Sequence, residues 1–262
     1  MFPGYFCCLV ACPGAGVVNR PVCVYNQSMR IVNRHGWQVT TSEAIRLQKE
    51  LAAEVSRTGD IPAPCLIAGV DISVNRWAKT GTGAVVVLSY PDLEIVEVKV
   101  VTDRIPFPYV PGLLSFREAP LILASCEELT VTPDIVMVDG QGIAHPRRVG
   151  LASHLGLFLD VPTIGCAKSR LCGSHKEPGI EAGSYAELLD GKEVIGAVLR
   201  TRTGVKPVYV SIGHRICLEA AIRWVKTCCR GYRLPEPTRL AHQAAGGFLK
   251  LKKGMALTGA VH

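Results

Sequence analysis

The 262-residue sequence lacks several features that would assign it to a specialised class of protein. No apolar run approaches the length needed to cross a membrane, so we expect no membrane partner. The eleven cysteines include no C-x-x-C pair and none spaced with histidines as in zinc fingers, which argues against the common zinc modules. Cysteines inside apolar segments, such as Cys126 and Cys166, behave as small reduced hydrophobes, so we expect a cytoplasmic protein.

The sequence also lacks a strongly basic body, although its formal net charge is +7. Residues 1–40 contain three arginines and no acid, and residues 250–262 contain three lysines and no acid, so residues 41–249 carry a net charge of only +1. Any interface with nucleic acid must therefore be a local patch. The length and the 48% apolar content predict one sizeable core, and we expect a monomer.

The hydrophobic pattern predicts three strands followed by alternating helices and strands. A capping-box sequence at residues 40–43 begins an amphipathic helix that ends near Gly59. The later elements expected are strands at 66–74, 83–89 and 94–102, a helix at 116–128, a strand at 135–138, a helix at 149–159, a strand at 162–166, a hairpin of strands at 184–189 and 194–201, a strand at 207–212 and a helix at 214–229. This order predicts an α/β fold with a ribonuclease-H-like mixed β-sheet flanked by helices.

One domain accounts for most of the chain. We expect it to span residues 41–237, because Pro235 and Pro237 precede a basic, glycine-containing tail at residues 238–262. Residues 1–40 are an unassigned N-terminal extension, and Met29 offers a simpler start that would leave residues 1–28 upstream of the functional domain.

The loop after the strand predicted at 135–138 is the most informative stretch. An apolar run ends in Asp139, Gly140 and Gly142 follow, and His145 and Arg147 close the loop. A strand that delivers a carboxylate to its C-terminal edge, followed by backbone free to approach a ligand, is how open α/β sheets build polar sites. Because Asp-Gly is also a common turn sequence, a structural turn is the alternative.

Two further acids lie in or beside apolar elements. Asp71 stands in a strand of otherwise apolar residues, and Glu118 is expected in the first turn of a helix. A buried lone carboxylate is costly unless it is paired or bound to a cation. The structural alternatives are an internal partner for Asp71 and a helix-dipole role for Glu118. With Asp139, these acids would form an all-oxygen site that selects Mg²⁺ or Mn²⁺ and suits phosphodiester hydrolysis.

Other polar residues are placed near this edge by the predicted strand order. Lys168 and Ser169 follow the strand at 162–166, where we expect contact with phosphate, and the same contact is expected of His145 and Arg147. His214 is expected to begin a helix, where it could activate water or lie beside a metal ion, with a plain helix residue as the alternative.

The segment at residues 104–114 is a stiff loop with an apolar tip. It contains three prolines and a glycine, and Phe107, Tyr109 and Val110 fit no periodic core position. A rigid aromatic wedge can enter a base stack and hold the gap left by a flipped nucleotide. Packing of the loop on its own domain is the alternative.

Taken in series, five blocks of this sequence resemble the endonuclease V family, the deoxyinosine 3′ endonucleases. The blocks are AGVDIS at 68–73, PYVPGLLSFRE at 108–118, VDGQGIAHPR at 138–147, GCAKS at 165–169 and SIGH at 211–214. The resemblance runs from about Ser42 to Pro237 and leaves both ends of the chain unmatched.

The resemblance implies a metal-dependent endonuclease that initiates repair of deaminated adenine. Such an enzyme nicks DNA at the second phosphodiester bond 3′ to deoxyinosine and leaves 3′-hydroxyl and 5′-phosphate ends. RNA containing inosine stays open as a second substrate. The alternatives are an inosine-specific endoribonuclease and a non-catalytic binder of inosine-containing nucleic acid.

The resemblance also implies a set of site residues. The metal ligands would be Asp71, Glu118 and Asp139, and the other catalytic residues Lys168 and His214. The strand-separating wedge would be formed by Pro108, Tyr109, Val110 and Pro111. The pocket for the flipped base would be lined by Gly112, Leu114, Gly140, Gly142, Gly165, Ala167 and Leu171. Fixed backbone groups in such a pocket would pair with hypoxanthine and leave adenine mispaired.

Overall fold

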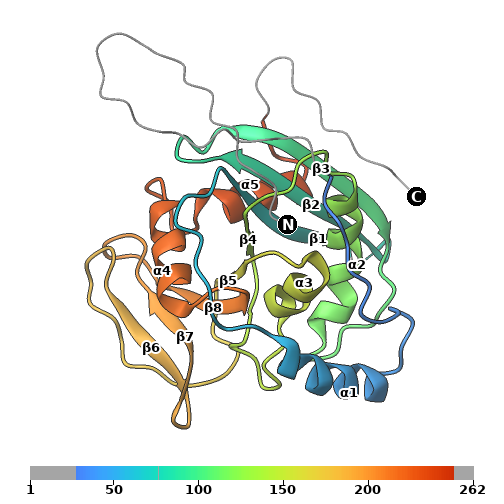
Figure 1. The fold of residues 1–262 in the computed structure, drawn as a ribbon, viewed down its shortest axis with the longest axis horizontal. Helices are drawn as coiled ribbons and strands as arrows, with labels where there is room; N and C mark the ends of the chain where they lie inside the picture. Colours follow the sequence, from blue (N-terminus) through green and yellow to red (C-terminus); the bar gives the residue numbers. More distant parts are fainter. Residues whose placement is uncertain (1–27, 76, 251–262) are drawn as a thin grey trace, which may run out of the picture.

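The computed structural model describes residues 28–75 and 77–250, which form one mixed sheet with helices on both faces (Figure 1). The eight strands lie in the order β3-β2-β1-β4-β5-β8-β7-β6. Their bounds are β1 Leu66–Asn75, β2 Thr80–Ser89, β3 Ile95–Arg104, β4 Ile135–Val138, β5 Thr163–Ala167, β6 Tyr185–Asp190, β7 Glu193–Leu199 and β8 Val208–His214. The predicted mixed sheet is confirmed, and the runs of six consecutive buried residues in β1 and in β2 fit strands that are covered on both faces.

Parallel pairing in the middle of the sheet determines where the site lies. β1, β2 and β3 form an antiparallel meander, whereas β4 pairs in parallel with both β1 and β5. In this register Val70 is opposite Val138, and Val138 is opposite Gly165. The residues that follow these three positions therefore lie at one edge of the central strands.

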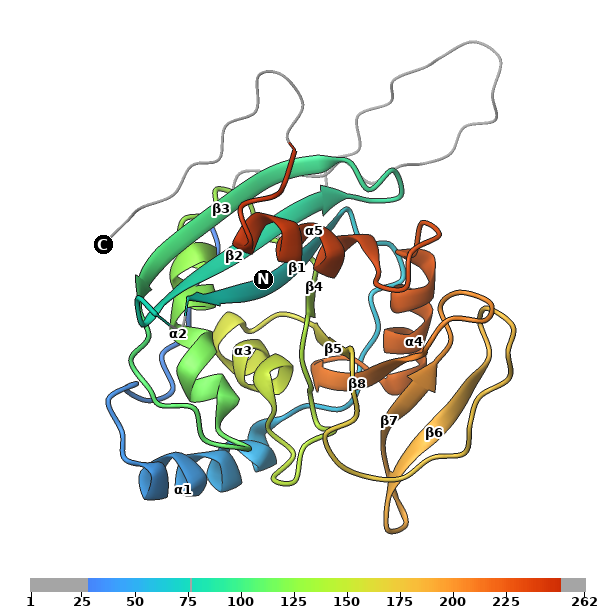
Figure 2. The ribbon, with the colours of Figure 1, turned by 180° about the vertical axis from the view of Figure 1, so that it is seen from behind.

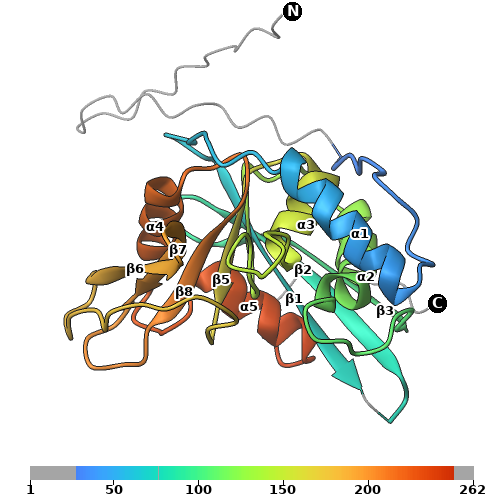
Figure 3. The same ribbon diagram turned by 90° about the horizontal axis from the view of Figure 1, so that it is seen from below.

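Helices from different parts of the chain cover the two faces. α2 (Leu114–Glu127) and α3 (Leu151–Leu159) pack on one face, where the apolar side chains of β1 and β4 meet them. α4 (Leu218–Thr227) and α5 (Glu236–Ala245) pack on the other face, α4 against β7 and β8 and α5 against β1 and β2. Figures 2 and 3 show α5 lying across β1, on the side away from α3.

α1 (Thr41–Leu51) begins with the predicted capping box and continues into a short 3₁₀ turn, η1 (Ala52–Glu54). The Thr40 side chain accepts from the backbone N–H of Glu43, and the Glu43 carboxylate accepts from the backbone N–H of Thr40. None of the helices in the described part of the chain is both long enough and apolar enough to span a membrane.

Both predicted domain boundaries cut through packed structure. The boundary at 237 lies inside α5. Pro235 and Pro237 were interpreted as the end of the domain, but proline is also common in the first turn of a helix. The boundary at 41 is also too late, since the N–H of Val32 donates to the carbonyl of Phe158 and Trp37 packs against α3. Apart from Ser28, the residues expected upstream of Met29 lie outside the described part of the chain, as do residues 251–262.

The contact between β1 and α5 is made through bare backbone. Gly69 of β1 faces Pro237, and a Cβ atom at position 69 would lie 1.9 Å from the carbonyl oxygen of Pro237. Only glycine allows α5 to lie this close to the sheet. This close packing brings the side chains of α5 to the edge where β1 carries Asp71.

Candidate active site

Two carboxylates meet at the edge of the central strands because of the parallel register. Asp71 follows Val70 in β1, and Asp139 follows Val138 at the end of β4. Both side chains are largely buried, with 10% of the Asp71 side chain and 8% of the Asp139 side chain exposed. Ligand atoms of Asp71, Asp139 and His242 lie within 4.8 Å of one another.

Glu118 approaches this pair from α2. The helix begins at Leu114, two residues earlier than predicted, so Glu118 lies in the second turn and not in the first, and an N-terminal dipole role no longer explains it. Burial, followed by the charge of Asp71, raises the pKa of Glu118 from its ordinary 4.5 to about 8. Burial, followed by the charge of Asp139, raises the pKa of Asp71 to about 6. The three acids therefore share one poorly solvated region.

His242 is the site residue that the sequence analysis missed. Its Nδ1 donates to Oδ2 of Asp71 at 2.7 Å, and 61% of its side chain is exposed. The residue belongs to α5, which was expected to be a tail. The available signal for a helix there was Glu236 between Pro235 and Pro237, followed by apolar residues at helical spacing.

Lys168 lies directly after β5 and contacts the carboxylate of Asp139. The Lys168 side chain is 40% exposed, so its ammonium group remains accessible from solvent. Its backbone is held by Arg233, whose Nη2 donates to the carbonyl of Lys168 at 2.6 Å and to that of Pro207 at 2.8 Å. This arrangement places a cation beside the acids at a fixed position.

His214 does not lie in this cluster, and the prediction that it begins a helix is wrong. It is the last residue of β8 and not the first of a helix, and it pairs with Thr163 at the start of β5, whereas Lys168 follows the other end. The imidazole Nδ1 accepts from the backbone N–H of Ser56 at 3.2 Å. Burial, with Arg215 as the next cause, lowers the pKa of His214 to about 4, so the ring is a neutral structural group.

The predicted phosphate contact of His145 does not fit its burial, and that of Arg147 stays a prediction. His145 is buried, and both side chains donate to the carbonyl oxygen of Gly112. Ser169 is exposed, and its carbonyl accepts from Nε2 of Gln141. Polar side chains in this loop were interpreted as ligand contacts, but those of His145 and Arg147 donate to a backbone carbonyl of the protein itself.

The proline-rich loop has an exposed tip, as a wedge requires. Tyr109 is 70% exposed, and Pro108 and Pro111 are also exposed. Phe107, in contrast, is buried against Phe116, and Val110 packs against the same cluster. The apolar tip is therefore smaller than expected and consists mainly of Tyr109 between prolines.

The glycines predicted to line a base pocket have a packing role in the structure. A Cβ atom at Gly142 would lie 1.9 Å from the carbonyl of Ile212, and one at Gly165 would lie 2.5 Å from the N–H nitrogen of Gly142. Leu114 and Leu171 are exposed, whereas Ala167 is buried. Close backbone packing accounts for glycine at 142 and 165, and the base pocket itself stays a prediction.

The donor set fits a hard divalent cation. Two buried carboxylates and an imidazole lie within 4.8 Å of one another, and Glu118 faces them. Burial is the largest cause of the raised pKa values of Asp71 and Glu118, and repulsion from the neighbouring carboxylates adds to it. A cation held by oxygen ligands would relieve this repulsion.

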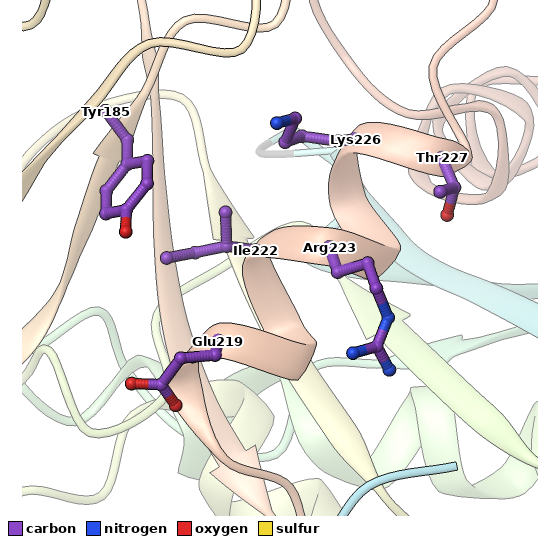
Figure 4. Close-up of a pocket in the computed structure, with 6 residues that line it drawn as sticks. All are labelled: Tyr185, Glu219, Ile222, Arg223, Lys226 and Thr227. Carbon is purple, nitrogen blue, oxygen red and sulfur yellow. The ribbon is translucent and has the colours of Figure 1, made fainter. Parts of the chain in front are cut away.

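A separate surface pocket lies between the start of β6 and α4 (Figure 4). It is lined by Tyr185, Glu219, Ile222, Arg223, Lys226 and Thr227. None of these residues belongs to the acidic cluster or to the predicted wedge and base pocket. This pocket therefore adds nothing to the candidate active site.

Comparisons with known proteins agree in one family. The family model of endonuclease V matches residues 49–243. Endonuclease V of Dehalococcoides mccartyi is 54% identical over 222 residues, which is 85% of this chain and 100% of the relative. The matched segment includes the acids, Lys168 and His242.

Solved structures agree with this similarity. Endonuclease V of Streptomyces avermitilis is 41% identical, with a TM-score of 0.78 over 84% of this chain and 97% of that chain. Endonuclease V of Ciona intestinalis, in complex with a 23mer DNA containing an inosine followed by a ribo-adenosine, is 28% identical, with a TM-score of 0.69 over 80% of this chain and 98% of that chain. The predicted ribonuclease-H-like fold is confirmed.

Proposed function

Because the chain belongs to the endonuclease V family, we propose that it nicks DNA at the second phosphodiester bond 3′ to deoxyinosine. The cut would leave 3′-hydroxyl and 5′-phosphate ends and begin the repair of deaminated adenine. The observation that carries the proposal is the meeting of Asp71, Asp139 and Lys168 at one edge of the sheet, inside the segment that the family model matches. The complex of the Ciona intestinalis relative with inosine-containing DNA supports the substrate.

The acids would hold a divalent ion, for which we propose Mg²⁺, with Mn²⁺ able to replace it. Asp71 and Asp139 would be the main ligands, and Glu118 would complete the anionic set. When bound, such an ion supplies an activated water and neutralises charge on the oxygens of the phosphodiester. His242 would hold Asp71 in place and exchange a proton at its exposed ring. Lys168 would contact the phosphate from the Asp139 side.

The wedge and the pocket would select the substrate. Tyr109, between Pro108 and Pro111, would enter the stack beside the lesion and hold the strands apart. Gly112 and Leu114, with the backbone of Gly140, Gly142, Gly165 and Ala167 and the side chain of Leu171, would surround the flipped base. Backbone groups at fixed positions would accept hypoxanthine and leave an adenine with unpaired polar groups.

RNA containing inosine is the second candidate substrate. In the complex of the Ciona intestinalis relative, the inosine is followed by a ribo-adenosine, which makes a ribose next to the lesion a case worth testing. The competing function is binding of inosine-containing nucleic acid without cleavage. Turnover that depends on a divalent ion would exclude that alternative.

A cleavage assay tests the proposal. Purified protein is incubated with Mg²⁺ and matched duplexes that carry deoxyinosine, inosine in an RNA strand, or adenine. Nicking of the deoxyinosine strand alone supports the DNA enzyme, and faster cleavage of the RNA strand favours the endoribonuclease. No cleavage of either inosine strand, with the protein folded, contradicts the proposal.

Metal binding has a test that does not depend on cleavage. Mg²⁺ and Mn²⁺ should raise the Tm of the wild type, because an ion that binds only the folded state stabilises it by about 2.7 kcal/mol at a hundred times its Kd. The same titration should leave the Tm of Asp71→Asn unchanged. An equal rise in both proteins would move the ion away from these acids.

The wedge is tested by one substitution. Tyr109→Ala should weaken cleavage of a deoxyinosine duplex more than cleavage of the same single strand, because only the duplex must be opened. Tyr232→Ala is a matched control, since Tyr232 is also exposed but lies after α4, outside the predicted wedge. Equal loss on both substrates would remove the strand-separating role.

A further inference from the structure

One backbone carbonyl accepts from three side chains that come from two separate segments. Nε2 of Gln48 in α1 donates to the oxygen of Gly112 at 3.1 Å. Nη2 of Arg147 donates to it at 2.7 Å, and Nε2 of His145 at 3.0 Å. A carbonyl oxygen has two lone pairs, so this acceptor is used beyond its ordinary capacity. One point of the backbone is thus held from both α1 and the loop after β4.

The donors are themselves held. Nε of Arg147 donates to Oε1 of Gln48 at 2.5 Å, and Nε2 of Gln48 also donates to the carbonyl of Val149 at 3.0 Å. Nδ1 of His145 accepts from the backbone N–H of Arg147 at 3.1 Å, which leaves the proton of the neutral ring on Nε2, where it faces Gly112. Gln48 is 1% exposed and His145 is 3% exposed, so these two side chains are turned inward.

The clamped residue lies between two parts of the proposed machinery. Gly112 directly follows the proline segment that carries Tyr109, and it has a φ of +78°, which favours glycine. Two of its three donors belong to the loop that begins at Asp139. The network of Gln48, His145 and Arg147 therefore links the segment with the exposed tyrosine to the segment with a buried acid.

We infer that Gln48 and Arg147 are positioning residues that set the distance between the wedge at Tyr109 and the acidic cluster, and so select which phosphodiester bond is cut. The inference rests on the proposed function. A nick at a fixed offset from a base requires that the group engaging the duplex and the group cutting it keep a constant separation. The two groups lie on different segments, and a displacement of about 1 Å can lower a rate about a hundredfold.

The experiment maps the nick at single-nucleotide resolution. A duplex with one deoxyinosine is cleaved by the wild type, Gln48→Leu, Gln48→Glu and Arg147→Met in the presence of Mg²⁺. Gln48→Leu removes the hydrogen bonds that Nε2 of Gln48 donates to Gly112 and Val149. Gln48→Glu keeps the shape of the side chain and the contact with Arg147, but it cannot donate to Gly112. We expect all three variants to cut at neighbouring bonds as well, with kcat/KM lowered about tenfold to a hundredfold.

Arg148→Met is the matched control. Arg148 lies in the same loop and donates to Glu193, Asp190 and the carbonyl of His145, but it does not contact Gly112. It should keep a single nick position even if its Tm falls. A single nick position in folded Gln48→Glu and Arg147→Met would overturn the inference, and so would a scattered nick in Arg148→Met. Absence of any nick by the wild type would instead overturn the proposed function, and the inference with it.

Discussion

Two largely buried polar clusters each include a residue from the first turns of α2, and they are built on opposite principles. In one, Asp71, Asp139 and Glu118 face each other, and burial together with their mutual charge raises the pKa of Asp71 and Glu118. In the other, His154 is wholly buried, and each ring nitrogen has a partner, the hydroxyl of Ser115 at 2.9 Å and Nε2 of His35 at 2.7 Å.

The difference separates function from stability. The histidine cluster is neutral, because burial lowers the pKa of His154 well below its ordinary value, and aromatic rings enclose it. It resembles a conventional core with satisfied polar atoms. In the acidic cluster, burial and the neighbouring carboxylates make ionisation of Asp71 and Glu118 costly, which is expected where a cation is to be bound. Substitutions in the two clusters should therefore act on different measurements.

The largest effect is expected from the acids. Asp139→Asn should lower the rate of nicking by about a thousandfold or more, since a metal ligand contributes several kcal/mol to the transition state. Its Tm should stay equal or rise, because one of the repelling charges is gone. Single-turnover cleavage and thermal unfolding of the same sample check both parts, and near-normal cleavage would contradict the site.

The opposite outcome is expected in the histidine cluster. Phe158→Ala should cost about 3–5 kcal/mol of stability, because Phe158 is fully buried against His35, Trp37 and His154. The rate per folded molecule should hardly change. Urea unfolding and active-site titration would separate the two quantities, and a large loss of rate in a fully folded sample would show that the clusters are coupled.

Two further histidines test the comparison more finely. His242→Gln should lower cleavage about a hundredfold, as expected for a group that moves a proton or holds Asp71, with little change in stability. His214→Gln should keep the rate and instead lower the Tm. His214 accepts from the backbone N–H of Ser56, and it pairs with Thr163 at the end of β5 that is away from Lys168. A loss of rate in His214→Gln with a normal rate in His242→Gln would instead support His214 as the catalytic histidine, as predicted from the sequence.

The smallest effect is a difference in how stability depends on pH. Without metal, Glu118 with a pKa of about 8 binds more protons in the folded state than in the unfolded state, so stability should fall as pH rises from 6.5 to 8. The slope is at most about 1.4 kcal/mol per pH unit. Urea unfolding in EDTA measures it, and Glu118→Gln should abolish it.

The histidines should act with the opposite sign. Their pKa values are lowered on folding, to about 4 for His145 and His214, so the unfolded chain takes up protons below about pH 6.5 and stability falls as pH drops. Between pH 4 and 6.5 the acids oppose this fall. Glu118→Gln should therefore make stability fall more steeply as the pH drops below about 6.5. A shallower fall would contradict the opposite signs assigned to the acids and the histidines.

The part of the site that could be predicted from sequence is the part determined by local pattern and parallel strands. Asp71 in an apolar run, Asp139 at a strand end and Lys168 after the next strand share one edge, because β1, β4 and β5 are parallel neighbours. The order of elements also predicted the sheet, because each strand is an apolar segment between clear turns.

The other features of the site depend on contacts between segments that are distant in the sequence, and hydrophobic periodicity does not encode such contacts. His242 meets Asp71 across 171 positions, and its helix starts with prolines that also end helices. His145 and Arg147 look like ligand-binding residues, and only the fold reveals Gly112 as their acceptor. His214 continues β8 because Thr163 pairs with it, which no local signal announces.

The contact of Gly69 with Pro237 has a consequence for genetics. Any substitution of Gly69 adds a side chain that must push α5 off β1, and His242 moves with that helix. A screen for loss of repair should therefore recover substitutions at Gly69 as if they altered a catalytic group. A second-site suppressor would be sought among the residues that begin α5, and not among those that touch the nucleic acid.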